Sequence, residues 1–96
     1  MAYHITTTNQ FERDVKRCMK RGMPMAELRS VISLLAKDGT LPDKYKPHKL
    51  SGERAGQWEC HIKSDWLLVW QQFEEELRLL MLSTGTHSDL FGKKKR

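Results

Sequence analysis

The chain has 96 residues, of which 39% are hydrophobic and 30% charged, and its formal net charge is +5. These proportions exclude an intrinsically disordered chain and fit one globular domain with a modest core. No apolar run could cross a bilayer, and residues 1–14 lack the apolar region of a secretion signal, so we expect a cytoplasmic protein.

The first half of the chain predicts a short strand and two helices. Residues 2–7 favour a strand, and residues 9–22 fit a helix that Asn9 caps and Gly22 ends. The apolar side chains of that helix form one stripe: Phe11, Val15, Cys18 and Met19. A second one-sided helix begins near Pro24 and ends near Gly39, so the two helices form a hairpin that must cover a sheet.

The second half predicts three strands, over residues 58–62, 66–73 and 76–84. In the first of them, Cys60 and Ile62 share one face while His61 and Lys63 share the other. The order βααβββ predicts an α+β domain, with an N-terminal helical hairpin packed on one face of a mostly antiparallel twisted sheet. We expect this single domain to span residues 1–92, followed by a basic tail at 93–96.

The two cysteines indicate the redox state of the chain, and its net positive charge indicates the kind of partner it binds. Cys18 and Cys60 fall at buried positions without metal-type spacing, which favours reduced core thiols over a disulfide. The net positive charge favours a polyanionic partner, either a nucleic acid or an acidic protein, with plain solubility as the alternative.

Four polar side chains fall in loops or on the uncovered face, near strand ends: His48, His61, Asp65 and His87. Each alone is most often only a surface residue, and the tryptophans are more often core than base-stacking platforms. No two histidines have the close helical spacing of zinc ligands, so we expect neither a metal nor another cofactor. Histidines on a basic surface can, however, cleave RNA by moving protons to and from an attacking 2′-hydroxyl and a leaving 5′-oxygen.

Three stretches in chain order, "YKPHKLSG", "WECHIKSDWLLVW" and "STGTHSDLFG", resemble the YafQ-type branch of the RelE/ParE superfamily of bacterial type II toxins. The resemblance extends more weakly through both helices. It implies a RelE-like fold and a ribosome-dependent endoribonuclease that cuts mRNA in the ribosomal A site by metal-independent 2′-hydroxyl attack. It also implies a cognate antitoxin as a partner, besides mRNA on the ribosome, with 16S rRNA contacts through the basic surface.

The resemblance also implies roles for individual residues. His48, His61, Asp65 and His87 match the family's acid–base set, and we expect His87 and His48 to transfer the protons. Asp65 would act as partner or co-base, and His61 would orient groups or stabilise charge. On the substrate side, the expected RNA-binding residues are Phe91, Trp66, Lys63, Arg54 and Ser83.

Ser83 departs from the family pattern, which commonly has an arginine at this position as the counter-charge for the phosphate. Either another cation replaces it, or the protein is weak or inactive, or the residue was changed to make the toxin tolerable. Arg78 has the wrong parity if the strand is regular, which favours Arg54 or Lys63. We therefore expect reduced but detectable cleavage. The alternatives are an inactive module that only occupies the ribosome or the antitoxin, and a ParE-like gyrase inhibitor.

Overall fold

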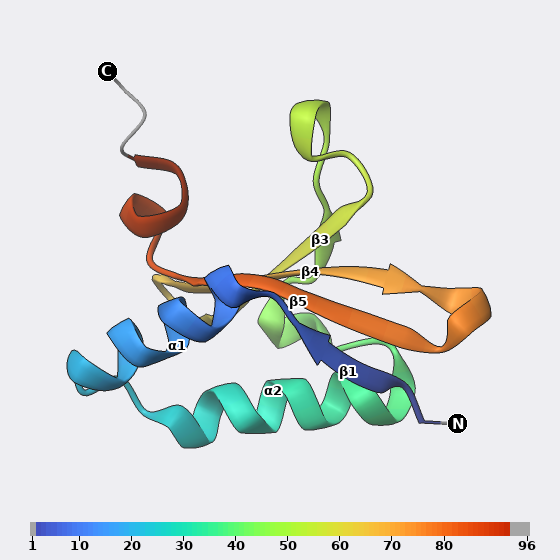
Figure 1. The fold of residues 1–96 in the computed structure, drawn as a ribbon, viewed down its shortest axis with the longest axis horizontal. Helices are drawn as coiled ribbons and strands as arrows, with labels where there is room; N and C mark the ends of the chain where they lie inside the picture. Colours follow the sequence, from blue (N-terminus) through green and yellow to red (C-terminus); the bar gives the residue numbers. More distant parts are fainter. Residues whose placement is uncertain (1, 93–96) are drawn as a thin grey trace.

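The computed structural model describes residues 2–92, so the predicted basic tail at 93–96 lies outside the described residues (Figure 1). Its helices are α1 (Asn9–Lys20) and α2 (Met25–Asp38). Its strands are β1 (His4–Thr7), β2 (His48–Lys49), β3 (Gln57–Lys63), β4 (Trp66–Phe73) and β5 (Arg78–Gly85). They form one sheet in the order β1-β5-β4-β3-β2, in which β1 runs parallel to β5 and the other neighbours are antiparallel.

The α+β class and the helical hairpin on one face of the sheet are confirmed (Figure 1). The two-residue strand β2 is an addition that the sequence pattern did not predict. The cap of α1 is Thr8 rather than Asn9, because the Thr8 hydroxyl accepts a hydrogen bond of 3.0 Å from the Phe11 amide. Helix α2 ends as predicted at Gly39, whose φ of 72° is left-handed.

The core lies between the helices and the face of the sheet that carries Cys60, Trp66 and Met81. Both cysteines are buried and free, as predicted. The apolar stripe of α1 differs from the expectation: Met19 is 57% exposed, whereas the charged Asp14 is only 1% exposed.

Asp14 is buried because it closes an edge of the sheet. Strand β1 pairs with β5 only as far as Met81, and α1 continues along the same edge. There the Thr84 amide donates to Asp14 Oδ2 at 3.2 Å, and the Thr84 carbonyl accepts from Arg17 Nη2 at 3.4 Å. Two side chains of a helix thus satisfy backbone groups that a further strand would otherwise pair.

The β4–β5 pairing contains a bulge that changes which side chains face the helices. Trp70 lies opposite Met81 and the adjacent Val69 lies opposite Ser83, so Leu82 is the extra residue. Met81 therefore faces the helices while Ser83, two residues later, faces away from them. From that second face project η4 (Ser88–Gly92) and the loop that carries η2 (Gly52–Arg54) (Figure 1). Within residues 2–92 no helix is long and apolar enough to span a membrane.

Candidate functional site

The first group of the candidate site joins the loop after β5 to the turn between β3 and β4. His87 Nδ1 donates to Asp65 Oδ1 at 2.7 Å, and the His87 backbone amide donates to the same oxygen at 3.1 Å. These hydrogen bonds lower the pKa of Asp65 below its usual value, so this carboxylate is charged at neutral pH. A carboxylate that accepts from Nδ1 leaves Nε2 of His87 as the nitrogen available to a substrate.

His61 completes this group from β3. Its ring centroid lies 5.7 Å from that of His87, with the two planes tilted by 55°. It lies on the face opposite the buried Cys60 and Ile62, as strand alternation predicts. Three of the four predicted catalytic residues therefore lie together.

His48 belongs to a second, adjacent group with Glu59. Its Nε2 lies 3.1 Å from Glu59 Oε1, and its Nδ1 donates to the Lys46 carbonyl at 2.9 Å. The strand register pairs His48 with Glu59, which makes His48 a diagonal neighbour of His61 on the same face. Within residues 2–92 no hydrogen bond or ion pair joins His48 to the first group.

Glu59 is the residue that sequence reasoning missed. Its side chain is 8% exposed, and among the described residues its buried Oε2 has no hydrogen-bond partner. A carboxylate that is both buried and incompletely paired is costly, which marks it as a candidate for a role beyond packing. The only signal in the sequence was its place two residues before His61, and the pairing with His48 could not be inferred without β2.

The prediction that Trp66 holds RNA is wrong. Trp66 is 2% exposed on the helix-covered face, and its indole N–H donates to the Thr84 hydroxyl at 2.9 Å. Phe91, in contrast, is half-buried on the second face, where the Arg54 guanidinium lies 5.0 Å from its ring centroid. Of these two predicted RNA-binding aromatic residues, only Phe91 offers part of its ring surface to a base.

Ser83 lies in a cleft of about 420 Å³, and the position of each candidate cation relative to it decides which one could serve there. Arg17, Arg54 and Asp89 also line this cleft. Lys63 does not: it lines a different hollow beside His61, and its Nζ is 4.0 Å from Glu27 of α2.

Arg78 shares the second face with Ser83, because the bulge at Leu82 reverses the parity. The parity argument against Arg78 as the replacement cation at Ser83 is therefore wrong. Arg78 is still excluded, because it lies too far away. Five residues of extended chain separate the two by about 17 Å. The Arg78 guanidinium is also engaged, with Nε bonded to Glu76 at 2.9 Å and the group lying 4.3 Å from the Phe73 ring centroid.

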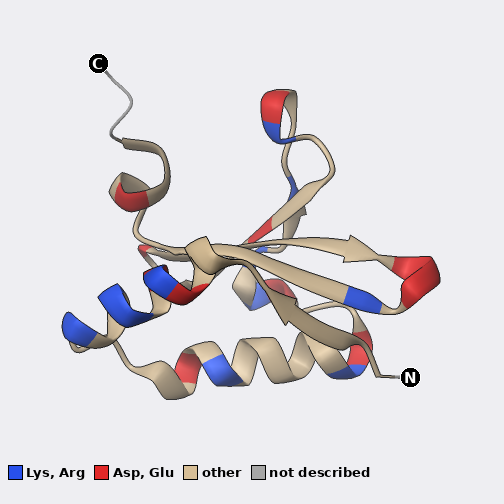
Figure 2. Cartoon of the chain, in the orientation of Figure 1, with Lys and Arg blue, Asp and Glu red and all other residues tan. Residues whose placement is uncertain are grey.

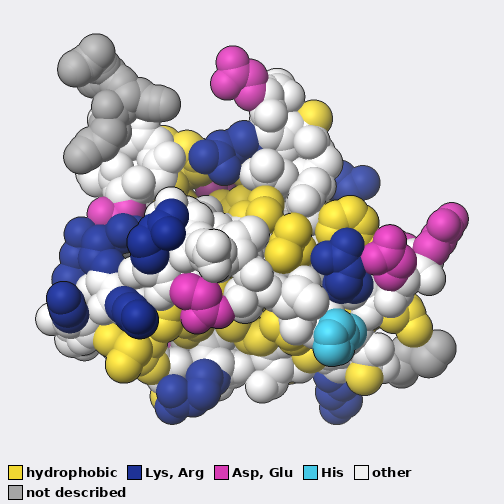
Figure 3. All heavy atoms as spheres, in the orientation of Figure 1, with side chains coloured by type: hydrophobic (Ala, Val, Ile, Leu, Met, Phe, Trp, Pro, Cys, Tyr) yellow, Lys and Arg dark blue, Asp and Glu magenta, His cyan; other side chains and the backbone are white. Residues whose placement is uncertain are grey.

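Charge is distributed unevenly over the molecule. Lys and Arg recur along α1, whereas the turn between β4 and β5 (Glu74–Glu76) is acidic (Figure 2). Figure 3 shows a cluster of basic side chains over α1, the helix that borders the Ser83 cleft, besides single basic groups elsewhere. A polyanion would be attracted to this end of the molecule. Within residues 2–92 no three His, Cys, Asp or Glu side chains are close enough to hold a metal ion.

Comparison with known proteins supports one family. Residues 3–92 match the model of YafQ, a bacterial toxin of type II toxin–antitoxin systems. The mRNA interferase toxin YafQ of Escherichia coli strain K12 is 36% identical over 89 residues, which cover 92% of this chain and 95% of that protein. A chain in the crystal structure of the Escherichia coli DinJ–YafQ toxin–antitoxin complex matches with a TM-score of 0.86 and 33% identity, covering 96% of this chain and 100% of that one. A crystal structure of a metal-bound toxin from Helicobacter pylori has a TM-score of 0.84 and 38% identity, with 95% and 100% covered.

Proposed function

Because the chain belongs to the YafQ family of bacterial type II toxins, we propose that it is an mRNA interferase, an endoribonuclease that inhibits translation. We further propose that it cuts mRNA in the ribosomal A site and that a cognate antitoxin neutralises it. The observation that carries the proposal is the group of His87, Asp65 and His61 on an open face beside a basic helix.

The proposed reaction needs only proton transfers. A base takes the proton of a 2′-hydroxyl, the 2′-oxygen bonds to the adjacent phosphorus, and the bond to the 5′-oxygen breaks as an acid protonates that oxygen. The products are a 2′,3′-cyclic phosphate and a 5′-hydroxyl. His87 is suited to one transfer, because ionised Asp65 holds a proton on Nδ1 and leaves Nε2 free.

We assign the second transfer to His61 rather than to His48. Both ring nitrogens of His48 are engaged, one by the Lys46 carbonyl and one by Glu59. Within the described chain no hydrogen bond occupies the ring of His61, which lies beside His87. His48, held by Glu59, would supply positive charge to the phosphate when protonated.

Mapping the 3′ ends of mRNA after induced expression tests the proposal. We expect cuts at a fixed position within codons and only on translated messages. Cuts restricted to naked RNA would contradict the ribosome-dependent reading. His87→Ala should lower cleavage by about 10²–10⁴-fold, since it removes one proton-transfer group. His4→Ala, an exposed histidine on β1, serves as the matched control.

The same variants separate the alternative functions. A gyrase inhibitor needs no acid–base group, so His87→Ala would remain toxic if the chain acted in that way. An inactive module would leave messages uncut in both the unmodified chain and the His87→Ala variant. The proposed nuclease loses both toxicity and cuts in this variant while retaining antitoxin binding.

A further inference from the structure

The cleft above Ser83 is close to the histidine group but is not part of it. It lies between α1, β5, η4 and the loop that precedes β3. Ser83 faces the same side of the sheet as His61, because the register aligns His61 with Leu67 and Gly85, two residues after Ser83. Ser83 lies two residues along the strand (about 6.7 Å) and two strands across (about 9.6 Å) from His61, so their backbones are about 12 Å apart on this face.

Arg54 enters this cleft in a fixed orientation and with its charge unmatched. Its guanidinium lies 5.0 Å from the Phe91 ring centroid, and its Nη1 donates to Gln57 at 3.2 Å. Within residues 2–92 no carboxylate forms an ion pair with it. Stacking on an aromatic ring preorganises a guanidinium without neutralising it.

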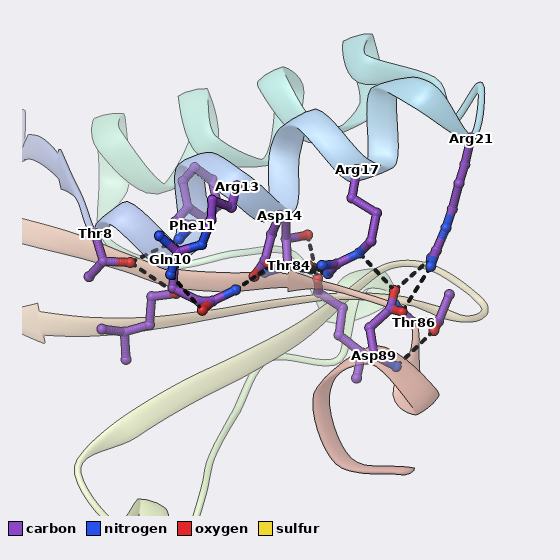
Figure 4. Close-up of polar contacts among 12 residues, drawn as sticks. Thr8, Gln10, Phe11, Arg13, Asp14, Arg17, Arg21, Thr84, Thr86 and Asp89 are labelled. Atoms are coloured by element: carbon purple, nitrogen blue, oxygen red, sulfur yellow. Dashed lines mark hydrogen bonds and ion pairs between the residues drawn. The ribbon is translucent and has the colours of Figure 1, made fainter. Parts of the chain in front are cut away.

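Arg17 approaches the cleft from α1, where a network of polar contacts holds it (Figure 4). Its Nη2 contacts Asp14 at 3.0 Å and the Thr84 carbonyl, and its Nε lies 3.7 Å from Asp89. Asp89 is bound more closely by Arg21, through contacts of 2.7 and 3.1 Å. Among the described contacts none uses Nη1 of Arg17, so this donor remains available to a ligand.

The charges around the cleft do not cancel. Three guanidinium groups, those of Arg17, Arg21 and Arg54, meet two carboxylates, those of Asp14 and Asp89. One positive charge is left over, at the arginine that has no acidic partner. A ligand with one negative charge and several acceptor oxygens would match this arrangement.

We propose that the cleft binds a backbone phosphodiester of the RNA strand that the histidine group cuts. Arg54 supplies the counter-charge, while Arg17 and the Ser83 hydroxyl supply further hydrogen bonds. This inference rests on the proposed function. The cleft lies on the histidine face, about 12 Å from His61 across the sheet. A bound RNA strand can span that distance, which favours a phosphate of the RNA over an acidic side chain of a protein partner.

The test combines loss and rescue in the full chain. The variants are Arg54→Ala and Arg17→Ala, each alone and combined with Ser83→Arg, and the measurement is single-turnover cleavage of mRNA on programmed ribosomes. In the proposed complex each arginine donates a hydrogen bond to the charged phosphate. Arg54→Ala should therefore slow cleavage about 10- to 100-fold, and Arg17→Ala somewhat less. Ser83→Arg places a guanidinium on the floor of the same cleft. Ser83→Arg should restore most of the cleavage rate of Arg54→Ala and Arg17→Ala. It should raise the cleavage rate of the unmodified chain only modestly.

Arg78→Ala is the control, because Arg78 lies on the same face of β5 but at its far end. Arg17 also holds Asp14, so thermal unfolding is measured in parallel, and Arg17→Lys replaces Arg17→Ala if the latter does not fold. A loss that Ser83→Arg does not rescue in folded protein, or equal effects of Arg54→Ala and Arg78→Ala, would overturn the proposal. So would unchanged cleavage with weakened antitoxin binding, which would assign the cleft to the protein partner. His87→Ala, assayed alongside, shows separately whether the proposed nuclease activity itself fails.

Discussion

At the scale of single residues, Thr84 connects two strands and a helix. Its side chain is fully buried, and its hydroxyl donates to the Leu67 carbonyl at 2.7 Å while accepting from the Trp66 indole at 2.9 Å. These bonds satisfy the one polar atom of an otherwise apolar tryptophan. They also fix the strand end from which the loop to His87 departs.

Replacing Thr84 by valine keeps the shape of the side chain but leaves the Trp66 N–H without an acceptor. We expect Thr84→Val to lower the free energy of unfolding by about 1–3 kcal/mol, the cost of an unsatisfied buried donor. Urea denaturation measures the change. Thr84→Ser, which keeps the hydroxyl, should lose clearly less, and a Thr84→Val variant as stable as the unmodified chain would contradict the stabilising role of the hydroxyl.

At the scale of secondary-structure elements, the C-terminal turn η4 is fastened to α1 by charge. Asp89 accepts from Arg21 at 2.7 and 3.1 Å and from the Thr86 amide at 2.9 Å. The hydrogen bond from Arg21 is the main cause that depresses the pKa of Asp89 far below its usual value, despite partial burial. This contact holds η4 in place, and two residues of η4, Asp89 and Leu90, line the cleft.

The attachment of η4 should therefore weaken in acid. Because the pKa of Asp89 is lower in the folded chain than the unfolded value of about 3.9, the stability it confers is complete above about pH 4. It is lost as the pH falls further towards the folded-state pKa. We expect Asp89→Asn to destabilise the protein by about 1–2 kcal/mol at neutral pH.

The pH profile distinguishes the carboxylate from its neighbours. The free energy of unfolding of Asp89→Asn, followed from pH 6 to about pH 2, should fall less steeply than that of the unmodified chain. Glu75→Gln, in the exposed acidic turn, provides a control. Parallel profiles for Asp89→Asn and the unmodified chain would mean that Asp89 carries no such stabilisation.

At the scale of the whole molecule, the basic face of α1 and the histidine face meet at the Ser83 cleft. We propose that this basic face guides the protein onto ribosomal RNA. Lys16 and Lys20 are exposed on α1 and take no part in the network around Arg17. The double variant Lys16→Glu/Lys20→Glu should weaken ribosome association and reduce the slope of log affinity against log salt by about one per lysine.

The loss of ribosome association should depend on where the substituted charge lies. Lys37→Glu, at the end of α2, changes the net charge in the same sense but lies outside α1. Its effect on ribosome association should be small. If Lys37→Glu weakened ribosome association as much as Lys16→Glu or Lys20→Glu alone, ribosome association would depend on net charge and not on the position of the charge.

How much the sequence predicts depends on how local each feature is. The helical hairpin, the three long strands and the placement of His61 followed from caps and alternation, which involve residues near one another in the chain. Strand β2, and with it the pairing of His48 with Glu59, depends on a partner eleven residues away. The burial of Asp14 depends on an unpaired edge of β5 seventy residues later, so periodicity within α1 could not predict it.

The side of the sheet on which a residue lies was predictable only where the strands are regular. The bulge at Leu82 reverses the parity of β5, which invalidated the argument about Arg78. Trp66 was misassigned for a different reason: the resemblance suggested an RNA contact, but alternation along β4 buries the ring against the helices. For Arg78 the assumption that β5 is regular failed, whereas for Trp66 the alternation was informative and the role taken from the resemblance failed.

The closure of β5 by Asp14 also has a consequence for hydrogen exchange. Most amides in a sheet are protected by a neighbouring strand and exchange when the strands separate. The Thr84 amide is bonded instead to a carboxylate on α1, so its proton becomes free to exchange when that helix lifts from the sheet. The exchange rate of this single amide therefore reports how often α1 undocks, independently of the opening of the sheet.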